Sequence, residues 1–483
     1  DFISHTQPMF NILPYTIETA KGLSYKQVWG MWATDNQVWL GSEDELGLFI
    51  NGKKIKTYDL YSHELVYNTH INTIYEDRQK RLWLGTYKNG ILLYKPDKQE
   101  IVHISSSLFN NLDVRCFYED QNGKMWIGTE TGIYSCTNEV LVKEEEIQKQ
   151  LPDIMVHSLL RDKEGKLWVG TFGKGISIFD VNNKLLWNFV IENGFCSNAV
   201  NHMIKDSEEQ IWVATREGLA VFKNTSQPNR YKIFKEKEGL ENSHIRAICE
   251  DLEKRIWISS NDGISCLDPK QNLFYNYNHH DGVPMGDFMN GSTCMTHNGI
   301  IYFGSQNGAC FFNPKELSSI RQVSPVKITQ FCKYNKKTES KDAEISIPFK
   351  KGVVHLPYNQ NSFRITFNVL DYTQSPQVEF TYMLEGLENR WYDTQGENQV
   401  IFRNIPPGKY NFKVRTRIRN QEWDKEIASL NIFIAPPLWL TWYAKLGYVI
   451  LFIFALYALL RFYKRKLDLE SSLEVERKQS LNK

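Results

Sequence analysis

The sequence predicts an all-β protein: a seven-bladed β-propeller, then an immunoglobulin- or fibronectin-like β-sandwich, one transmembrane helix and a short cytoplasmic helix. Three observations predict this order. A Trp-centred repeat runs to about residue 312, strongly alternating strands follow it, and a long apolar segment lies near the end. The composition, which is 13% aromatic and includes 13 Trp, also favours strands over helical bundles.

The repeat is a charged turn followed by an apolar residue, Trp, a second apolar residue, a small residue and Thr or Ser. Examples are EDRQKRLWLGT at Glu76–Thr86 and RDKEGKLWVGT at Arg161–Thr171. The anchor aromatic recurs every 42–45 residues, as Trp39, Trp83, Trp126, Trp168, Trp212, Trp257 and Tyr302. Seven copies at this period fit propeller blades, whereas a helical solenoid would show a 3.6-residue periodicity.

Each copy divides into four short strands separated by turn-forming residues. In the copy around Trp212 we expect strands at Ala199–Ile204, Ile211–Ala214, Leu219–Phe222 and Tyr231–Lys235. The copy around Tyr302 has only three strands, and Phe10–Thr19 resembles a fourth. Pairing of these two chain ends would close the ring without an exposed strand edge. We therefore expect the propeller at residues 10–312, with residues 1–9 as the remnant of an upstream module.

A second domain is expected at residues 313–435, where the repeat stops and strands with period-two alternation begin. Phe363, Ile365, Phe367 and Val369 would share one face of a strand. The same alternation places Phe380, Tyr382 and Leu384 together, and likewise Tyr410, Phe412 and Val414. About seven strands in about 110 residues are typical of a β-sandwich.

A resemblance to a known family follows from four motifs in order: LPYNQNSFRITF, FTYMLEGLENRW, NIPPGKYNFKV and IAPPLWLTWYA, at 356–367, 380–391, 404–414 and 434–444. Together with the propeller repeats they resemble the tyrosine-rich sandwich that follows regulator-propeller repeats in hybrid two-component sensors of glycan-degrading gut bacteria. The resemblance implies a sensor region that controls a histidine kinase. Such sensors typically carry two propellers and a kinase, and this chain shows one propeller and no kinase. With Asp1 at its start, the chain is therefore expected to be a fragment.

The apolar segment Leu438–Leu460 is long enough, at about 34 Å as a helix, to cross a bilayer. Trp439, Trp442 and Tyr443 lie at one end, and Arg461, Lys464, Arg465 and Lys466 lie at the other. The basic end is expected to be cytoplasmic. This predicts a single pass of the inner membrane at 436–461, a periplasmic region at 1–435 and a truncated cytoplasmic signalling helix at 462–483.

Several classes of function are disfavoured. The formal net charge of +1 argues against a nucleic-acid partner. The eight cysteines show no CxxC spacing, so no metal site is expected, and Cys116, Cys249, Cys266 and Cys310 fit as small core residues. No catalytic motif is present, so the chain is predicted to be neither an enzyme nor a cofactor binder. The Asp that precedes each Trp is interpreted as a turn former.

Topology predicts where a ligand would bind. In an antiparallel blade, the start of the first strand and the end of the second lie at the same end, so the residues after each Trp-x-Gly-Thr should surround one mouth of the central channel. The ligand-binding candidates there are Tyr87, Lys88, Arg115, Phe172, Lys174, Arg216, His244 and Arg246. Aromatic faces suit sugar rings, and Arg suits carboxylate or sulfate groups. A solvated loop rim is the simpler alternative for each residue.

The predicted function is therefore detection of an oligosaccharide, an anionic one in particular, and relay of the signal across the membrane by a homodimer. Two alternatives remain open at this stage. The propeller could be a membrane-tethered enzyme acting on polysaccharide, which would need a His/Tyr or paired-carboxylate arrangement in the mouth. It could also be a protein-binding scaffold, because propellers host many functions.

Overall fold

The computed structural model divides into two compact units, Asp1–Arg321 and Gln322–Lys483. Each unit has its own hydrophobic core. The residues described are, by number, 9–19, 22–43, 45–60, 70–104, 112–317, 325–333, 344–345, 353–369, 378–394, 396–418 and 423–481.

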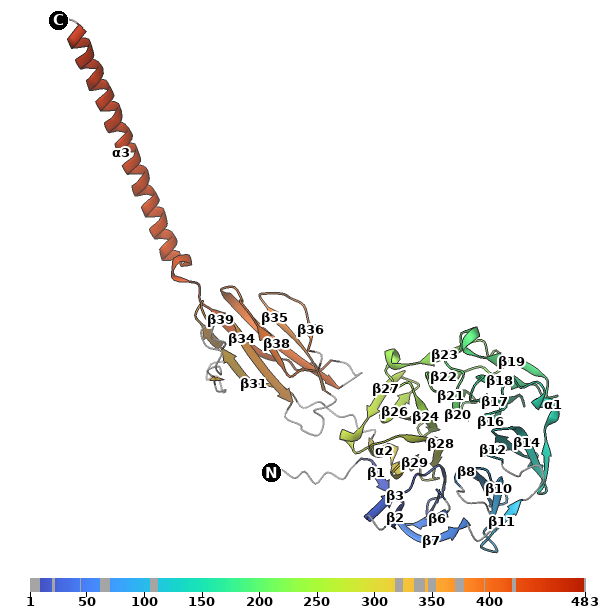
Figure 1. Cartoon of the computed structure of the whole chain (residues 1–483). Helices are drawn as coiled ribbons and strands as arrows, with labels where there is room; N and C mark the ends of the chain where they lie inside the picture. Colours follow the sequence, from blue (N-terminus) through green and yellow to red (C-terminus); the bar gives the residue numbers. More distant parts are fainter. Residues whose placement is uncertain are drawn as a thin grey trace. The chain divides into compact units, whose positions relative to one another are not determined.

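Unit 1 is a β-propeller. Its described residues form one four-stranded antiparallel sheet, or blade, for each of the seven copies of the repeat. Figure 1 shows these blades arranged around a central axis. Blades 1 to 3 comprise β4 (Gly30–Ala33), β5 (Gln37–Gly41), β6 (Glu45–Ile50) and β7 (Lys53–Asp59); β8 (Ile71–Glu76), β9 (Leu82–Thr86), β10 (Ile91–Lys95) and β11 (Glu100–Ile104); β12 (Val114–Glu119), β13 (Met125–Thr129), β14 (Gly132–Thr137) and β15 (Val140–Lys143).

The remaining blades follow in chain order. Blades 4 to 6 comprise β16 (Val156–Arg161), β17 (Leu167–Thr171), β18 (Ile176–Phe179) and β19 (Leu185–Phe189); β20 (Val200–Lys205), β21 (Ile211–Thr215), β22 (Gly218–Phe222) and β23 (Tyr231–Phe234); β24 (Ile245–Glu250), β25 (Ile256–Ser260), β26 (Ile264–Asp268) and β27 (Leu273–Tyr277). Blade 7 comprises β28 (Phe288–Met295), β29 (Ile301–Ser305), β30 (Gly308–Phe312) and β1 (Asn11–Leu13). Short helices in this unit are α1 (Glu145–Gln148), η2 (Ile191–Asn193), η3 (Glu236–Glu238) and η4 (His279–Asp281).

The blades pack face to face through the apolar side chains that the repeat supplies. The first strand of each blade is innermost and contacts the first strand of the next blade, including β28 against β4. Trp83 of blade 2, for example, shares a core with Val114 and Phe117 of blade 3. The cysteines are free thiols, and Cys266 and Cys310 are buried in these cores as expected.

Blade 7 is completed by both ends of the propeller sequence. Strand β1 pairs antiparallel with β30, with Asn11 opposite Phe311 and Leu13 opposite Ala309. Phe10 is 2% exposed and contacts the rings of Phe312 and Tyr277 at centroid distances of 4.9 and 5.2 Å. The prediction that this segment provides the outer strand of the blade around Tyr302 is confirmed for residues 11–13.

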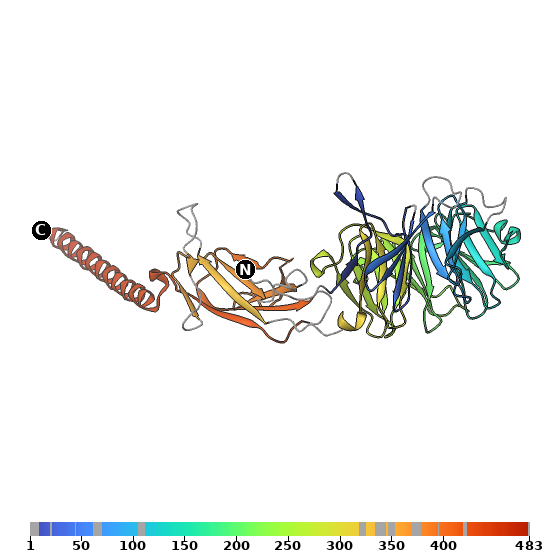
Figure 2. The same ribbon diagram turned by 90° about the horizontal axis from the view of Figure 1, so that it is seen from below.

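The rest of that segment does not continue the blade. Instead, β2 (Thr16–Thr19) pairs with β3 (Gly22–Tyr25) in a separate hairpin, so the prediction of one strand over Phe10–Thr19 was wrong. Pro14 lies between β1 and β2 and has no N–H to donate to a ladder. Figure 2 shows the hairpin projecting from the propeller beyond the ends of the blade strands.

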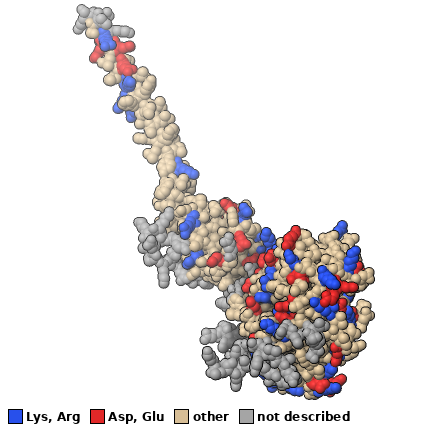
Figure 3. All heavy atoms as spheres, turned by 45° about the vertical axis from the view of Figure 1, so that its right-hand side comes forward, with Lys and Arg blue, Asp and Glu red and all other residues tan. Residues whose placement is uncertain are grey.

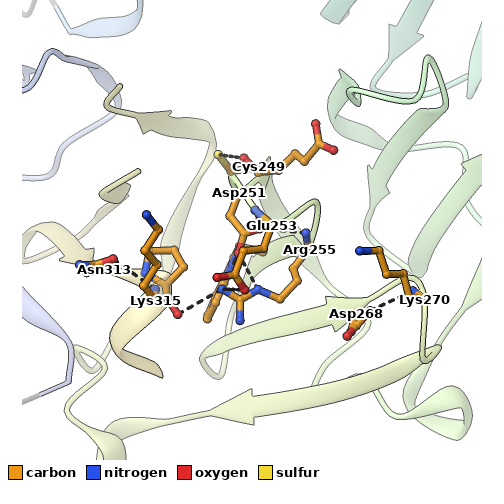
Figure 4. Close-up of polar contacts among 11 residues, drawn as sticks. Cys249, Asp251, Glu253, Arg255, Asp268, Lys270, Asn313 and Lys315 are labelled. Carbon is orange, nitrogen blue, oxygen red and sulfur yellow. Dashed lines mark hydrogen bonds and ion pairs between the residues drawn. The ribbon is translucent and has the colours of Figure 1, made fainter. Parts of the chain in front are cut away.

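Arg255 holds the segment through which the chain leaves the propeller. Its guanidinium pairs with Asp251 at 2.7 Å and donates a hydrogen bond of 3.1 Å to the carbonyl of Pro314 (Figure 4). Pro314 begins α2 (Pro314–Leu317), and Leu317 packs against the core shared by blades 6 and 7. The propeller unit therefore extends past residue 312, and Met9 also packs on this core.

Unit 2 contains the β-sandwich. Its strands are β31 (Val326–Lys333), β32 (Glu344–Ile345), β33 (Val353–Leu356), β34 (Phe363–Val369), β35 (Val378–Glu385), β36 (Tyr392–Asp393), β37 (Gln399–Phe402), β38 (Gly408–Ile418) and β39 (Ala428–Ile434). They form two sheets, in the orders β32-β31-β34-β37 and β33-β39-β38-β35-β36. The predicted alternation is confirmed in β34, where Phe363, Ile365, Phe367 and Val369 are all buried. The hydroxyl of Tyr410 donates a hydrogen bond of 2.7 Å to the carbonyl of Pro406 and fixes the preceding turn.

A single long helix ends the described chain. The turn η6 (Leu438–Leu440) comes first, and α3 spans Trp442–Leu481, so the helix begins after the expected Leu438 and passes residue 461 without a break. Among the described residues, α3 is the one helix long and apolar enough to cross a membrane, and its apolar side chains are exposed. Figure 3 shows a long stretch of α3 without charged atoms, followed by mixed charges toward the C-terminus.

Candidate binding site at the propeller mouth

A β-bulge recurs at the start of the first strand in blades 2 to 6. The register shifts between the first and third residues of β8, β12, β16, β20 and β24. A bulge leaves its extra residue outside the ladder and redirects its side chain. The extra residues are all polar: Asn72, Arg115, His157, Asn201 and Arg246. The fold thus places a polar side chain at the same point of five successive innermost strands.

A second set of residues joins these at the same end of the blades. In blades 2 to 5 and in blade 7, the residue after the second strand donates its backbone N–H to a carbonyl just before the first strand. The bonds run from Tyr87 to His70 (2.8 Å), Glu130 to Asp113 (3.1 Å), Phe172 to Met155 (3.0 Å), Arg216 to Ala199 (3.2 Å) and Gln306 to Asp287 (3.2 Å). We call this end of the blades the mouth. The topology predicted from the sequence is therefore present.

Arg115 is bound by two carboxylates from its own blade. Its guanidinium donates to Asp113 at 2.8 Å and also to Glu130. Asp113 is buried and also accepts a 2.6 Å hydrogen bond from the Asn72 amide of blade 2. Burial raises the pKa of Asp113 to about 7 against the opposing charge of Arg115, and Glu130 raises it further. The positive charge of Arg115 is therefore neutralised within the protein.

Arg246 is similarly held by neighbouring side chains. It donates from Nε to the Asn261 side chain at 2.7 Å and from one terminal nitrogen to Asn290 at 3.1 Å. Its other terminal nitrogen pairs with Asp287 at 3.3 Å. Burial lowers the pKa of Arg246 from its usual value, while Asp287 opposes this and the charge of Arg216 adds to it.

His244 lies beside this cluster. The Asn261 amide is 3.4 Å from His244 Nδ1, and His244 Nε2 has no hydrogen-bond partner among the described residues. Burial lowers the pKa of His244, and the charges of Arg246 and Arg216 lower it further, so the imidazole is neutral at pH 7.

Phe172 and Arg216 form a stacked pair between blades 4 and 5. The guanidinium carbon of Arg216 lies 4.4 Å from the centroid of the Phe172 ring. The His157 ring lies 5.0 Å from the same ring, and His157 Nε2 has no hydrogen-bond partner within the described part of the chain. Burial, then the charge of Arg115, lower the pKa of His157 to about 4, so it too is neutral at pH 7.

The other predicted residues lie apart from this group. Tyr87 contacts the His70 ring at 5.7 Å, and Lys88 lies over the Tyr87 ring at 4.8 Å. Lys174 is exposed and its ammonium is 3.9 Å from Glu192, so it does not contribute a free charge to the mouth. The loop that carries Lys174 is held by a hydrogen bond of 2.8 Å from the Gly173 N–H to the Asp153 carboxylate. Five of the eight predicted residues are connected to one another. Phe172 contacts the ring of His157, and the charges of Arg115 and Arg216 lower the pKa of His157. The charge of Arg216 also lowers the pKa values of His244 and Arg246.

Sequence reasoning missed several members of this site, namely His157, Asn72, Asp113, Glu130, Asn261, Asp287 and Asn290. His157 could have been found, because aligning the copies places it in the same position as Arg115 and Arg246. Asn290 and Asp287 could not, since the irregularity of β28 spans Phe288–Thr293 and breaks the alignment. Within the described residues, no group of three His, Cys, Asp or Glu is placed to hold a metal ion.

A separate pocket lies where blades 5 and 6 meet at the opposite end, near the turns before their second strands. It is lined by Asp206, Glu208, Gln210, Lys254 and Asn272, among other residues. Glu208 and Lys254 pair across it at 3.1 Å. Two of its charged side chains are therefore engaged with each other, and we take the mouth as the better candidate for a ligand.

Comparison with known proteins identifies both domains. The Two component regulator propeller family matches residues 66–88, 107–131 and 150–173, and the Y_Y_Y domain family matches residues 371–435. Histidine kinase P4 from Formosa agariphila is 24% identical over 480 residues, which cover 86% of this chain and 35% of that protein.

Solved structures agree with these matches. The extracellular domain of the hybrid two component system BT3049 from B. thetaiotaomicron is 39% identical with a TM-score of 0.81, over 90% of this chain and 58% of that one. The extracellular domain of BT4673 from the same organism shares the fold, with a TM-score of 0.51 and 19% identity, over 90% of this chain and 60% of that one. The chain thus spans about a third of the curated relative and under two thirds of these structures.

These matches and the membrane-length helix α3 support a single-pass membrane protein with an extracellular domain. The chain contains two-component regulator propeller repeats and a Y_Y_Y domain, and its homologues are the extracellular sensor domains of hybrid two-component histidine kinases.

Proposed function

We propose that this chain is the ligand-sensing and signal-relay part of a two-component sensor, and that its ligand is an oligosaccharide bound at the propeller mouth. One observation carries the proposal. Blades 3, 4 and 6 bring Arg115, His157 and Arg246 to the same end of their innermost strands, and Arg216 follows the second strand of blade 5 at that end. Among the described residues, Arg115 Nε and His157 Nε2 have no hydrogen-bond partner. A ring of donors and acceptors of this kind suits a hydroxyl-rich ligand.

The proposal includes the location and the output. Units 1 and 2 up to residue 435 would lie in the periplasm, α3 would cross the inner membrane, and residues 462–483 would lead to a cytoplasmic histidine kinase. The exposed apolar surface of α3 and the basic cluster Arg461–Lys466 support this orientation. A homodimer would let ligand binding change the spacing of two α3 helices. Signalling requires the ligand to favour one arrangement over another, because equal affinity for both would shift nothing.

The carboxylates of the mouth do not favour the tethered-enzyme alternative. A glycosidase needs two carboxyl groups free to act on substrate. Asp113 and Glu130 are bound to Arg115, and Asp287 is bound to Arg246. The pairing of these carboxylates supports a receptor rather than an enzyme.

A glycan-array screen of the full chain in lipid nanodiscs tests the proposal. Hydrogen exchange on the best hit should show protection of amides at the starts of β12, β16, β20 and β24. Protection confined to other surfaces, or no glycan bound at all, would overturn the proposal. Turnover of the bound glycan would point to the enzyme instead.

A further inference from the structure

The three arginines of the mouth differ in how their charges are balanced. Arg115 is shared by two carboxylates, and its side chain is 25% exposed. Arg246 is held by one carboxylate and two amides, and its side chain is 17% exposed. Arg246 donates to protein groups from Nε and from both terminal nitrogens, and Arg115 donates to both of its carboxylates from one terminal nitrogen. A ligand anion at either arginine would compete with the carboxylates already paired to it.

Arg216 is different. It is exposed, and no carboxylate or carbonyl among the described residues accepts a hydrogen bond from its guanidinium. Its contact is with the face of Phe172, at 4.4 Å. A guanidinium stacked on an aromatic ring keeps its five N–H donors directed outward in the plane of the group. Arg216 is therefore oriented and unpaired.

The surroundings of Arg216 add to its positive potential. The Arg216 charge lowers the pKa of His157, His244 and Arg246, which shows that these groups lie within electrostatic range. The nearby carboxylate Asp287 already binds Arg246, and Asp153 already binds the Gly173 N–H. Neither carboxylate forms an ion pair with Arg216.

Phe172 also has a role other than the one expected from the sequence. Arg216 covers its ring from one blade, and the His157 ring lies 5.0 Å away and tilted by 38°. A ring occupied in this way is not free to stack on a sugar. It instead fixes the position of the guanidinium.

We propose that Arg216 binds a single anionic group of the ligand, a carboxylate or sulfate on a sugar, and that Phe172 is the positioning residue that holds its guanidinium. The inference rests on the proposed function, because it assumes that the ligand binds at the mouth. Of the five cationic side chains that the sequence placed at the mouth, only Arg216 is then expected to contact the anion. Arg115 and Arg246 are predicted to support the site without contacting it.

Calorimetry on the full chain in nanodiscs tests this with three matched pairs of probes. These are oligogalacturonate and its methyl ester, oligomannuronate and its methyl ester, and a chondroitin sulfate oligosaccharide and its desulfated form. We expect at least one acidic member to bind more tightly than its partner, and the pair that differs identifies the anion. Arg216→Met should lower that affinity about ten- to hundredfold, because one charge-assisted hydrogen-bonding group is lost. Lys88→Met, which removes another exposed cation at this end of the blades, should change it less than about twofold.

The positioning role has its own readout. Phe172→Leu should weaken binding of the acidic probe, and Phe172→Tyr should restore it because the ring is kept. Phenylglyoxal should modify Arg216 in preference to Arg115 and Arg246, and the acidic probe should protect it while its neutral partner does not.

Two results would overturn the inference: unchanged affinity of Arg216→Met, or acidic probes that bind no better than their neutral partners. A neutral glycan that the array places at the mouth, with no acidic probe bound, would overturn this inference and leave the proposed function intact. Array hits placed away from the mouth would overturn both.

Discussion

Asp206 accepts a hydrogen bond of 2.8 Å from the indole N–H of Trp212. Its other carboxylate oxygen accepts the backbone N–H groups of Glu208 and Gln210, at 2.9 and 2.8 Å. One buried carboxylate thus fixes a turn and the anchor aromatic of the same blade. The same indole bond recurs as Asp77–Trp83 (2.8 Å), Asp120–Trp126 (3.1 Å), Asp162–Trp168 (3.0 Å) and Asp251–Trp257 (2.8 Å).

This pair makes a first prediction. Asp206→Ala should destabilise blade 5 by about 2–3 kcal/mol, because it removes the turn bonds and leaves the buried indole N–H without a partner. Asp180→Ala is the matched control, since Asp180 accepts the backbone N–H groups of Asn182 and Lys184 in the same way but binds no Trp. It should cost only about 1 kcal/mol. Hydrogen exchange measures each cost in the strands beside the altered turn, β20–β22 for Asp206→Ala and β18–β19 for Asp180→Ala. Equal costs would show that the indole bond contributes nothing.

The turn role of these Asp residues followed from the sequence, whereas the indole bond did not. Recurrence of Asp at one place in each copy is sufficient to predict a turn. The second carboxylate oxygen reaches the indole because the folded turn brings Trp, six residues after Asp, back beside the carboxylate. This contact depends on the folded hairpin and not on the sequence pattern alone. Because turn formers recur between the strands of every copy, the repeat also predicted the four strands of blade 5 to within a residue or two at their ends.

A second prediction concerns closure of the ring. Phe10→Ala should destabilise blade 7 by about 3–5 kcal/mol, because Phe10 is buried between blades 6 and 7 against Tyr277 and Phe312. Ile12→Ala, two residues along the chain in β1, is the control, since Ile12 is 42% exposed. Faster hydrogen exchange in β28–β30 for Phe10→Ala alone would be the expected result. If both variants behave alike, the N-terminal strand does not seal the blade through its core contact.

The candidate site was only partly predictable, for a physical reason. Equivalent positions in the repeat predict where the backbone places a side chain. Arg115 and Arg246 do occupy the same position, the bulge in the first strand of their blades. What neutralises them comes from elsewhere: Asp287 and Asn290 lie in the next blade, more than 40 residues away from Arg246. Lys174 was predicted to join the cluster, but its ammonium lies 3.9 Å from Glu192, and Asp153 binds the N–H of the preceding Gly173. Charge balance depends on partners that the pattern of one strand does not contain.

A third prediction is acid sensitivity from a half-buried histidine. His202 Nδ1 accepts a 3.3 Å hydrogen bond from the backbone N–H of Ile248 in the next blade, and burial lowers the pKa of His202 from 6.5 to about 4. The unfolded chain therefore binds the proton more tightly than the folded one. The free energy of unfolding contributed by neutral His202 is nearly complete above about pH 6.5. It is lost as the pH falls toward 4, by roughly 2–3 kcal/mol at pH 4.5.

His202→Asn tests this, because the Asn side-chain oxygen can replace Nδ1 as the acceptor and does not titrate. Urea denaturation of the variant and the wild type between pH 4.5 and 8 should give curves that converge at low pH, as the wild type alone loses this stability. The pKa of His157 is also lowered to about 4. Because His157 is present in both proteins, its contribution cancels in the difference between their free energies of unfolding. If the free energies of unfolding of the two proteins change with pH in parallel, protonation of His202 does not destabilise the folded state, and the prediction is wrong.

The last prediction concerns the orientation of α3 in the membrane. Asn398→Cys on the sandwich and Val475→Cys near the end of α3 are both exposed positions, whereas six of the eight native cysteines are buried and should label poorly. Because Arg461, Lys464, Arg465 and Lys466 follow the apolar stretch, that end of α3 should be cytoplasmic. A membrane-impermeant maleimide should therefore label Asn398→Cys in intact spheroplasts and should label Val475→Cys only after permeabilisation. The wild-type chain provides the background. Labelling of Val475→Cys alone in intact spheroplasts would reverse the orientation and would remove the propeller mouth from contact with external ligands.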